Sequence, residues 1–333
     1  MPIKILTILT VLGMVVETLL MKVALTHWSI GMVGAISRIF TVALLACWVL
    51  SRGAGWRRLA PRGAGWWLVL MGFNAIAINL LLFAAMKGLT TATNYALLYR
   101  LDIVFVVLIG TMLGLERIGW RELALLPIML FGVACVAEVR FSELEPHIVG
   151  DLMVVGAALG FAVNAFVLRR IFVSMDTEAV ALINVSITGL GFLGLMLIRN
   201  EIATSGSALA DPMAWLWVVL FGVCFAVYLA LYYVTLRRLP VWKLRMWMLS
   251  VPVIIAIVDA VVWDTRLSVQ QGSGMVLVLL GLAGLIWLER NHGFLLRRNG
   301  VRSQSAEKEP QEITGPHGTD PNENVTLLGS EVD

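Results

Sequence analysis

The chain has 333 residues, of which 59% are hydrophobic and only 14% are charged, and its formal net charge is +3. With a mean hydropathy of +0.87, this composition excludes an ordinary soluble domain, which needs far less apolar surface at this length. Apolar runs of about 20 residues, the length of a membrane-spanning helix, recur along the sequence. We therefore predict a polytopic membrane protein.

The predicted fold is all-α, with ten transmembrane helices joined by short connections. The first run is too long for a signal peptide and another span follows it, so we expect it to be retained. After residue 289 the sequence becomes polar, and 290–333 is predicted to be a disordered cytoplasmic tail. The ten spans are expected at 4–26, 31–50, 65–86, 91–113, 121–139, 148–168, 179–198, 213–236, 241–263 and 272–289.

Arginine and lysine residues set the predicted orientation, because basic residues gather on the cytoplasmic side of membrane proteins. With the N-terminus in the cytoplasm, most basic flanks of the ten spans lie inside. An even number of spans then places both termini in the cytoplasm, and we expect the cell (inner) membrane as the location. The outer flanks hold only Lys87, Arg140, Arg199 and Arg266.

The two halves of the chain, 1–139 and 148–289, are predicted to be five-helix repeats. Residues 72–89 align with 222–239 at an offset of 150, and LGLERI at 113–118 aligns with VWDTRL at an offset of 149. Because five is odd, the second copy enters the membrane from the opposite side, which makes an inverted repeat. The alternative is that any two membrane segments rich in leucine and glycine can be aligned.

Three features resemble the EamA-type branch of the drug/metabolite transporter superfamily. They are Lys22 in LLMKVAL, Arg38 in AISRIFTVALL, and LGLERI at the end of the fourth span. The resemblance implies a bundle in which spans 1–4 and 6–9 surround a central cavity while spans 5 and 10 are peripheral. It also implies an exporter or exchanger of small metabolites.

Charged residues inside the spans mark a polar interior, because each costs at least about 2.5–3.5 kcal/mol at the centre of a helix. The fourth span carries Arg100 and Asp102. On a continuous helix, Asp102 shares a face with Tyr95 and Tyr99, while Arg100 points almost the opposite way. Since Arg100 and Glu17 lie at similar estimated depths, we expect them to form an ion pair.

Neutral polar groups in the spans could bind a substrate, or they could bridge helices at about 1 kcal/mol each. Asp102, the charge nearest the midplane, is the expected proton-coupling residue, although an ion pair would make it a structural anion. Lys22 and Asp259 are expected to reach the outer interface, and Arg245 is interpreted as a cytoplasmic flank. The candidate substrate-binding or coupling residues are Glu17, Arg38, Asn79, Tyr95, Tyr99, Arg100, Asp102, Asn164 and Tyr232.

The predicted function is secondary transport of a small polar or amphipathic metabolite by alternating access. The alternative is a membrane scaffold or lipid-interacting subunit with the same fold. The sequence contains neither a nucleotide-binding P-loop nor a G-x-S-x-G elbow, and its four histidines fall outside the centres of the spans. We therefore expect no enzymatic activity, no cofactor, no metal and no nucleic acid. The expected partners are a small-molecule substrate and membrane lipids, with a homodimer left open.

Overall fold

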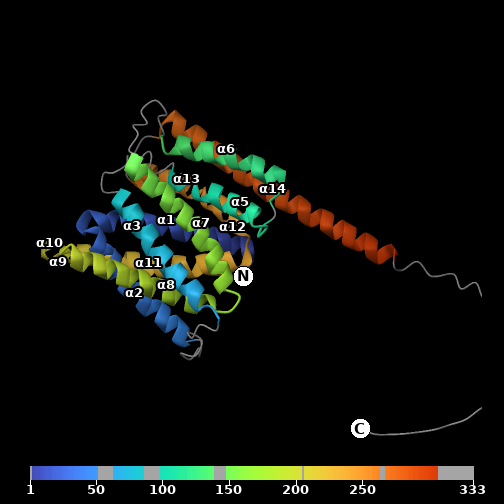
Figure 1. The fold of residues 1–333 in the computed structure, drawn as a ribbon. Coiled ribbons are helices and arrows are strands. Elements are labelled where there is room, and N and C mark those ends of the chain that lie inside the picture. The colour runs from blue at the N-terminus through green and yellow to red at the C-terminus, as the bar shows by residue number, and fades with distance from the viewer. Residues whose placement is uncertain are drawn as a thin grey trace, which may run out of the picture. The chain divides into compact units, whose positions relative to one another are not determined.

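A computed structural model describes residues 2–51, 63–85, 98–116, 118–138, 148–204, 206–262 and 267–306. All regular elements in these ranges are helices, which confirms the predicted all-α class. The helices are α1 (Ile3–His27), α2 (Ile30–Ser51), α3 (Gly65–Ala84), α5 (Asp102–Met112), α6 (Trp120–Val136), α7 (Ile148–Ile171), α8 (Thr177–Ile198), α9 (Glu201–Thr204), α10 (Gly206–Leu209), α11 (Pro212–Arg238), α12 (Val241–Met248), α13 (Val251–Val262) and α14 (Val269–Ala306) (Figure 1).

Eight helical segments in the described ranges are long and apolar enough to cross a membrane. They are α1, α2, α3, α7, α8, α11, the α12–α13 pair and the first part of α14. Helices also occupy the two other predicted spans, since α5 has 11 residues and α6 has 17. The protein is therefore an integral membrane protein, and the full count of ten spans stays a prediction.

The chain divides into two compact units, residues 1–286 and 287–333. The second unit begins with the continuation of α14, which runs to Ala306. The tail was predicted to be disordered from residue 290. Helix α14 instead continues to Ala306, well beyond that boundary. Residues 307–333 lie outside the described ranges.

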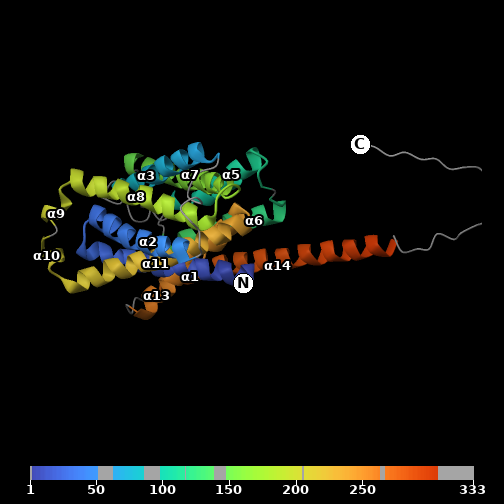
Figure 2. The ribbon, with the colours of Figure 1, turned by 90° about the horizontal axis from the view of Figure 1, so that it is seen from below.

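Within the first unit, the helices of the two halves alternate around a closed ring of packed neighbours. In order, α7 packs on α3, α3 on α8, α8 on α2, α2 on α11, and α11 on α1. The ring continues from α1 to the α12–α13 pair, then to α5, and from α5 back to α7. Figure 2 shows α3, α8, α2 and α11 in this order. Exchanging the two halves maps the ring onto itself, as a two-fold relation between repeats would require.

Helix α6 packs on α13 and lies outside this ring, as expected of the fifth span. It also crosses α14 at a pair of glycines. A Cβ atom added to Gly132 would lie 2.9 Å from the carbonyl oxygen of Gly274, so the two backbones touch directly. Small residues allow such close crossings in membranes, where no hydrophobic effect drives helices together.

The predicted fourth and ninth spans are both interrupted, at positions that the repeat offset of 149 relates. A turn at Arg100 and Leu101 precedes α5, and Leu249 and Ser250 separate α12 from α13. Pro252 explains the second break, because proline has no N–H and its ring clashes with the preceding helical turn. The prediction of one continuous helix through residue 100 is therefore wrong. Interrupted helices at matching places in two halves are typical of transporter binding sites.

Hydrogen bonds between helices tie the ring together. The Asn74 side chain donates to the carbonyl of Gly160 on α7 at 2.8 Å, and the hydroxyls of Thr10 and Thr235 lie 2.9 Å apart. The Asn184 amide donates to the Tyr233 hydroxyl at 2.5 Å. For Asn74 and Asn184, the helix-bridging alternative of the sequence analysis is the one that the structure supports.

Candidate functional site

A buried ion pair joins α5 to α12. The Arg245 Nη1 atom lies 3.0 Å from Asp102 Oδ2, and these side chains are only 7% and 6% exposed. Arg245 Nη2 also donates a hydrogen bond to the Tyr232 hydroxyl at 3.2 Å. The rings of Tyr232 and Phe161 each have their centroid 5.8 Å from the guanidinium carbon. The arginine is thus held between a carboxylate and two aromatic rings, which offset the cost of burying its charge.

The interpretation of Arg245 as a cytoplasmic flank is wrong, because its guanidinium is buried against Asp102. An arginine near the cytoplasmic end of a span satisfies the positive-inside rule even when its side chain points into the protein. The rule therefore could not distinguish a cytoplasmic arginine from a buried one. The sequence did contain one indication of this ion pair. Asp102 needs a cation in a low-dielectric interior, and Arg245 lies in the ninth span, which the repeat relates to the fourth.

A second charged centre lies between α1 and α2. Arg38 stacks on Phe225, with its guanidinium carbon 3.9 Å from the ring centroid, and lies 5.5 Å from the centroid of Phe192. Glu17 is close enough for its charge to act on Arg38. Thr18 donates a hydrogen bond to Glu17 at 3.4 Å.

The expected ion pair between Glu17 and Arg100 is wrong. The charged residue near Glu17 is Arg38. Arg100 lies beside Tyr99, and its charge acts on Asp102. Equal depth in the membrane does not fix the direction in which a side chain points. In the ring, α5 packs between α7 and α12, so α1 is not its neighbour.

An aromatic face of α11 connects the two charged centres. The ring centroids of Phe225 and Tyr228 are 6.2 Å apart, and those of Tyr228 and Tyr232 are 5.9 Å apart. Spacings of three and four residues place these rings on one side of the helix. Phe225 contacts Arg38 at one end and Tyr232 contacts Arg245 at the other. We call Phe225, Tyr228 and Tyr232 the aromatic ladder.

Other predicted residues extend this region. Tyr99 packs edge-on against Phe161, with centroids 5.6 Å apart, and Tyr228 lies within electrostatic range of both Tyr99 and Glu17. Asn164 is one helical turn from Phe161. Tyr95 lies outside the described residues. The structure therefore brings Glu17, Arg38, Tyr99, Arg100, Asp102 and Tyr232 around the two centres.

Several buried polar atoms of this region lack a hydrogen-bond partner within the part of the chain that the structure describes. They are Arg38 Nε, Arg245 Nε, and the amide oxygens of Asn164 and Asn184. Native structures satisfy nearly all buried polar groups with protein atoms or water, so each unmet group needs an explanation. A polar ligand or water bound beside the two arginines would satisfy their Nε atoms.

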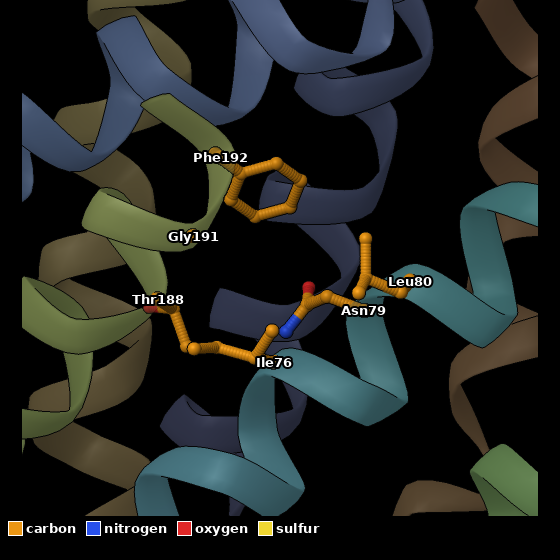
Figure 3. Close-up of a pocket in the computed structure, with 6 residues that line it drawn as sticks. All are labelled: Ile76, Asn79, Leu80, Thr188, Gly191 and Phe192. Atoms are coloured by element: carbon orange, nitrogen blue, oxygen red, sulfur yellow. The ribbon is translucent and has the colours of Figure 1, made fainter. Parts of the chain in front are cut away.

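Asn79 belongs to α3, a helix that carries none of the residues of the two centres. Its amide donates to the carbonyl of Ala75 in its own helix at 2.6 Å. It lines a small pocket between α3 and α8, with an empty volume of about 200 Å³ (Figure 3). Thr188 and Phe192 line the opposite side, and Phe192 is also one of the rings near Arg38. The pocket therefore adjoins the Arg38 centre.

Comparison with known proteins shows that part of the chain is similar to one family. Residues 148–287 match the model of the EamA-like transporter family. This similarity covers 140 of the 333 residues. The match agrees with the predicted resemblance to EamA-type transporters, although Lys22, Arg38 and LGLERI lie outside the matched residues. The matched family suggests a membrane transporter.

The fold itself extends beyond the matched part. A solved structure described as "Crystal structure of protein" is similar to this chain, with a TM-score of 0.72 and 19% sequence identity. The similarity covers 87% of this chain and 98% of the other, so the two share a fold. No curated protein matches significantly. The EamA-like family is one of transporters, which agrees with the expectation that the chain is not an enzyme.

Proposed function

We propose that the protein is a secondary transporter that exports or exchanges a small polar or amphipathic metabolite by alternating access. The observation that carries this proposal is the pair of buried charged centres joined by the aromatic ladder. Arg38 and Arg245 can bind acidic groups, Glu17 and Asp102 can bind basic ones, and the ladder offers apolar contact between them. The unmet Nε atoms of both arginines supply donors for such a ligand.

The ring supports alternating access for a geometric reason. Because helices of the two halves alternate, a small rotation of one half against the other changes the packing all around the ring. Such a motion opens one end of the ring while it closes the other. The breaks at Arg100–Leu101 and Leu249–Ser250 give the two related spans a place to bend beside the charged centres.

A non-transporting scaffold with the same fold is the alternative, and the buried charges argue against it. Asp102 and Arg245 are almost fully buried, and replacing such a pair with apolar residues is often neutral or stabilising. A scaffold would gain little from keeping them. Uptake and release of metabolites by purified protein in lipid vesicles separates the two functions, since a scaffold moves no solute.

We assign the proposed proton coupling to Glu17 rather than to Asp102. Asp102 is in direct contact with Arg245, whereas Glu17 forms no ion pair within 4.0 Å among the described residues. The groups that face Glu17 are Arg38, Thr18 and Tyr228. A carboxylate without a direct cationic partner can take up and release a proton with less disruption than one in a tight pair.

We therefore expect Glu17→Gln to leave a folded protein that still exchanges metabolite but no longer responds to a pH gradient. The measurement is flux into vesicles with and without an imposed gradient. The matched control is Glu138→Gln, which removes an exposed carboxylate just after the end of α6 and should change nothing. If Glu17→Gln keeps the full pH response, Glu17 is not the coupling residue.

The orientation gives a separate prediction, because both termini should lie in the cytoplasm. A phosphatase reporter that is active only outside the cytoplasm, fused after residue 290, should be inactive. A fluorescent protein that matures in the cytoplasm should be bright at the same position. The reverse pattern would reject the predicted topology.

A further inference from the structure

A buried glutamate of the first half binds the start of a helix in the second half. Glu116 lies between α5 and α6, and its side chain is 2% exposed. Its Oε1 atom accepts hydrogen bonds at 2.6 Å from both Arg169 Nη1 and the backbone N–H of Val241. Its Oε2 atom accepts from the backbone N–H of Trp242 at 3.1 Å. Arg169 also donates to the carbonyl of Leu239 at 3.1 Å, which extends the contact to the end of α11.

Glu116 does for α12 what a capping residue of that helix would ordinarily do. Val241 and Trp242 begin α12, and the first N–H groups of a helix have no partner within it. The residue at the cap position is Pro240, whose side chain makes no capping hydrogen bond. A carboxylate is favourable there because of the helix dipole. The start of α12 therefore depends on a charge from the other half of the chain.

A second buried glutamate makes the reciprocal contact. Glu201, in α9, is 5% exposed and accepts hydrogen bonds from the Ser29 hydroxyl at 2.7 Å and the Met32 backbone N–H at 3.2 Å. These groups lie at the start of α2, in the first half. A Cβ atom added to Gly31 would overlap Glu201 Oε2, so glycine is what lets the carboxylate approach.

The two contacts lie at opposite ends of the ring. Arg169 is at the end of α7, next to the beginning of α8, whereas Glu201 follows the other end of α8. That helix has 22 residues, so it spans about 33 Å at 1.5 Å per residue. Figure 2 shows α9 beyond one end of α8.

We infer that Glu116 and Glu201 are gate latches, each of which holds one end of the ring closed by binding the start of a helix from the other half. Release of one latch lets its end open while the other stays shut. This inference rests on the proposed transport function and adds the residues that position the gates. Both glutamates bind the starts of helices, at the ends of the ring, and so differ in role from the charges of the two centres.

The test measures the opening of each end separately in the full-length protein in vesicles. Spin labels at Leu115 and Arg238 report on the Glu116 end, and labels at Thr26 and Ile202 report on the Glu201 end. All four positions are exposed, and each pair joins the two halves. The native cysteines Cys47, Cys135 and Cys224 are first replaced with serine.

We expect Glu116→Gln to lengthen the 115–238 distance and Glu201→Gln to lengthen the 26–202 distance, each without lengthening the other. Loss of a charge-assisted contact should change the ratio of open to closed populations by about tenfold, equivalent to about 1.4 kcal/mol. Gly31→Ala should act like Glu201→Gln, because it displaces the carboxylate without removing its charge. Gly194→Ala is its matched control, since nothing lies within 4 Å of the added methyl group.

A merely structural role would lower stability without moving the two distances separately. The latch inference is overturned if both glutamine variants stay folded and lengthen the same distance, or if neither distance changes. If a variant does not fold, Glu116→Asp or Gly31→Ala provides the same measurement with the charge retained. If the distances shift as expected but vesicles that contain the wild-type protein transport nothing, the proposed transport function is wrong. The assignment of Glu116 and Glu201 as latches is then retained.

Discussion

Replacing Arg245 with glutamine is expected to destabilise the protein by about 3–5 kcal/mol, because it leaves the buried Asp102 carboxylate without its partner. The Arg245 Nη1 and Asp102 Oδ2 atoms are 3.0 Å apart and both side chains are almost fully buried, so the remaining carboxylate would be an uncompensated buried charge. The hydrogen bond from Arg245 to the Tyr232 hydroxyl is lost as well. The measurement is thermal or denaturant unfolding in detergent, followed by flux in vesicles.

A double-mutant cycle separates the pair from its individual charges. Asp102→Asn alone should also be strongly destabilising, because it leaves a buried guanidinium unpaired, whereas the variant with both substitutions should recover part of the loss. Lys243→Gln is the matched control on the same helix. Lys243 is partly exposed and lies 5.4 Å from the Trp242 ring centroid, so its charge is not buried. A double variant no more stable than the worse single variant would contradict the pairing.

Hydropathy, charge bias and the internal repeat predicted the spans well because they report on a helix as a whole. The all-α class and the presence of helices at the predicted spans follow from runs of about 20 apolar residues. The EamA resemblance came instead from Lys22, Arg38 and LGLERI. The same signals did not predict which residues contact each other. Depth along a helix can be counted from the sequence, but the direction of a side chain depends on which helices are neighbours.

The errors over Glu17 and Arg245 come from that missing information. Glu17 and Arg100 have similar depths, yet α1 and α5 are not neighbours in the ring, and Glu17 lies near Arg38 instead. Tyr232 was predicted as a site residue from its type and span, and it does contact Arg245. A polar group in a span was therefore a sound signal for the site, although it could not identify the partner.

Glu116 shows the same limit in a motif that the sequence did reveal. LGLERI marked the end of the fourth span, but the groups that Glu116 binds lie more than 50 residues away, at Arg169, Val241 and Trp242. The helix break at Arg100 was also missed, since that stretch contains no proline or glycine. Both features depend on packing between the halves, which hydropathy does not record.

The crossing of α2 and α11 gives the last prediction, because it holds Arg38 over the aromatic ladder. A Cβ atom added to Gly222 would lie 2.7 Å from the carbonyl oxygen of Ser37. That atom belongs to the backbone of α2, so it cannot rotate away as a side chain would. The Thr41 hydroxyl also donates to the Gly222 carbonyl at 2.8 Å, which fixes the register of the two helices.

We therefore expect Gly222→Val to force α2 and α11 apart, with a loss of about 1–3 kcal/mol in the free energy of unfolding. Transport should fall as well, because Arg38 and Phe225 lie on the same turns and their 3.9 Å contact would lengthen. Gly194→Val, where a Cβ atom meets nothing within 4 Å, should leave stability and flux unchanged. Equal behaviour of the two variants in unfolding and flux measurements would mean that close approach at Gly222 does not hold the site together.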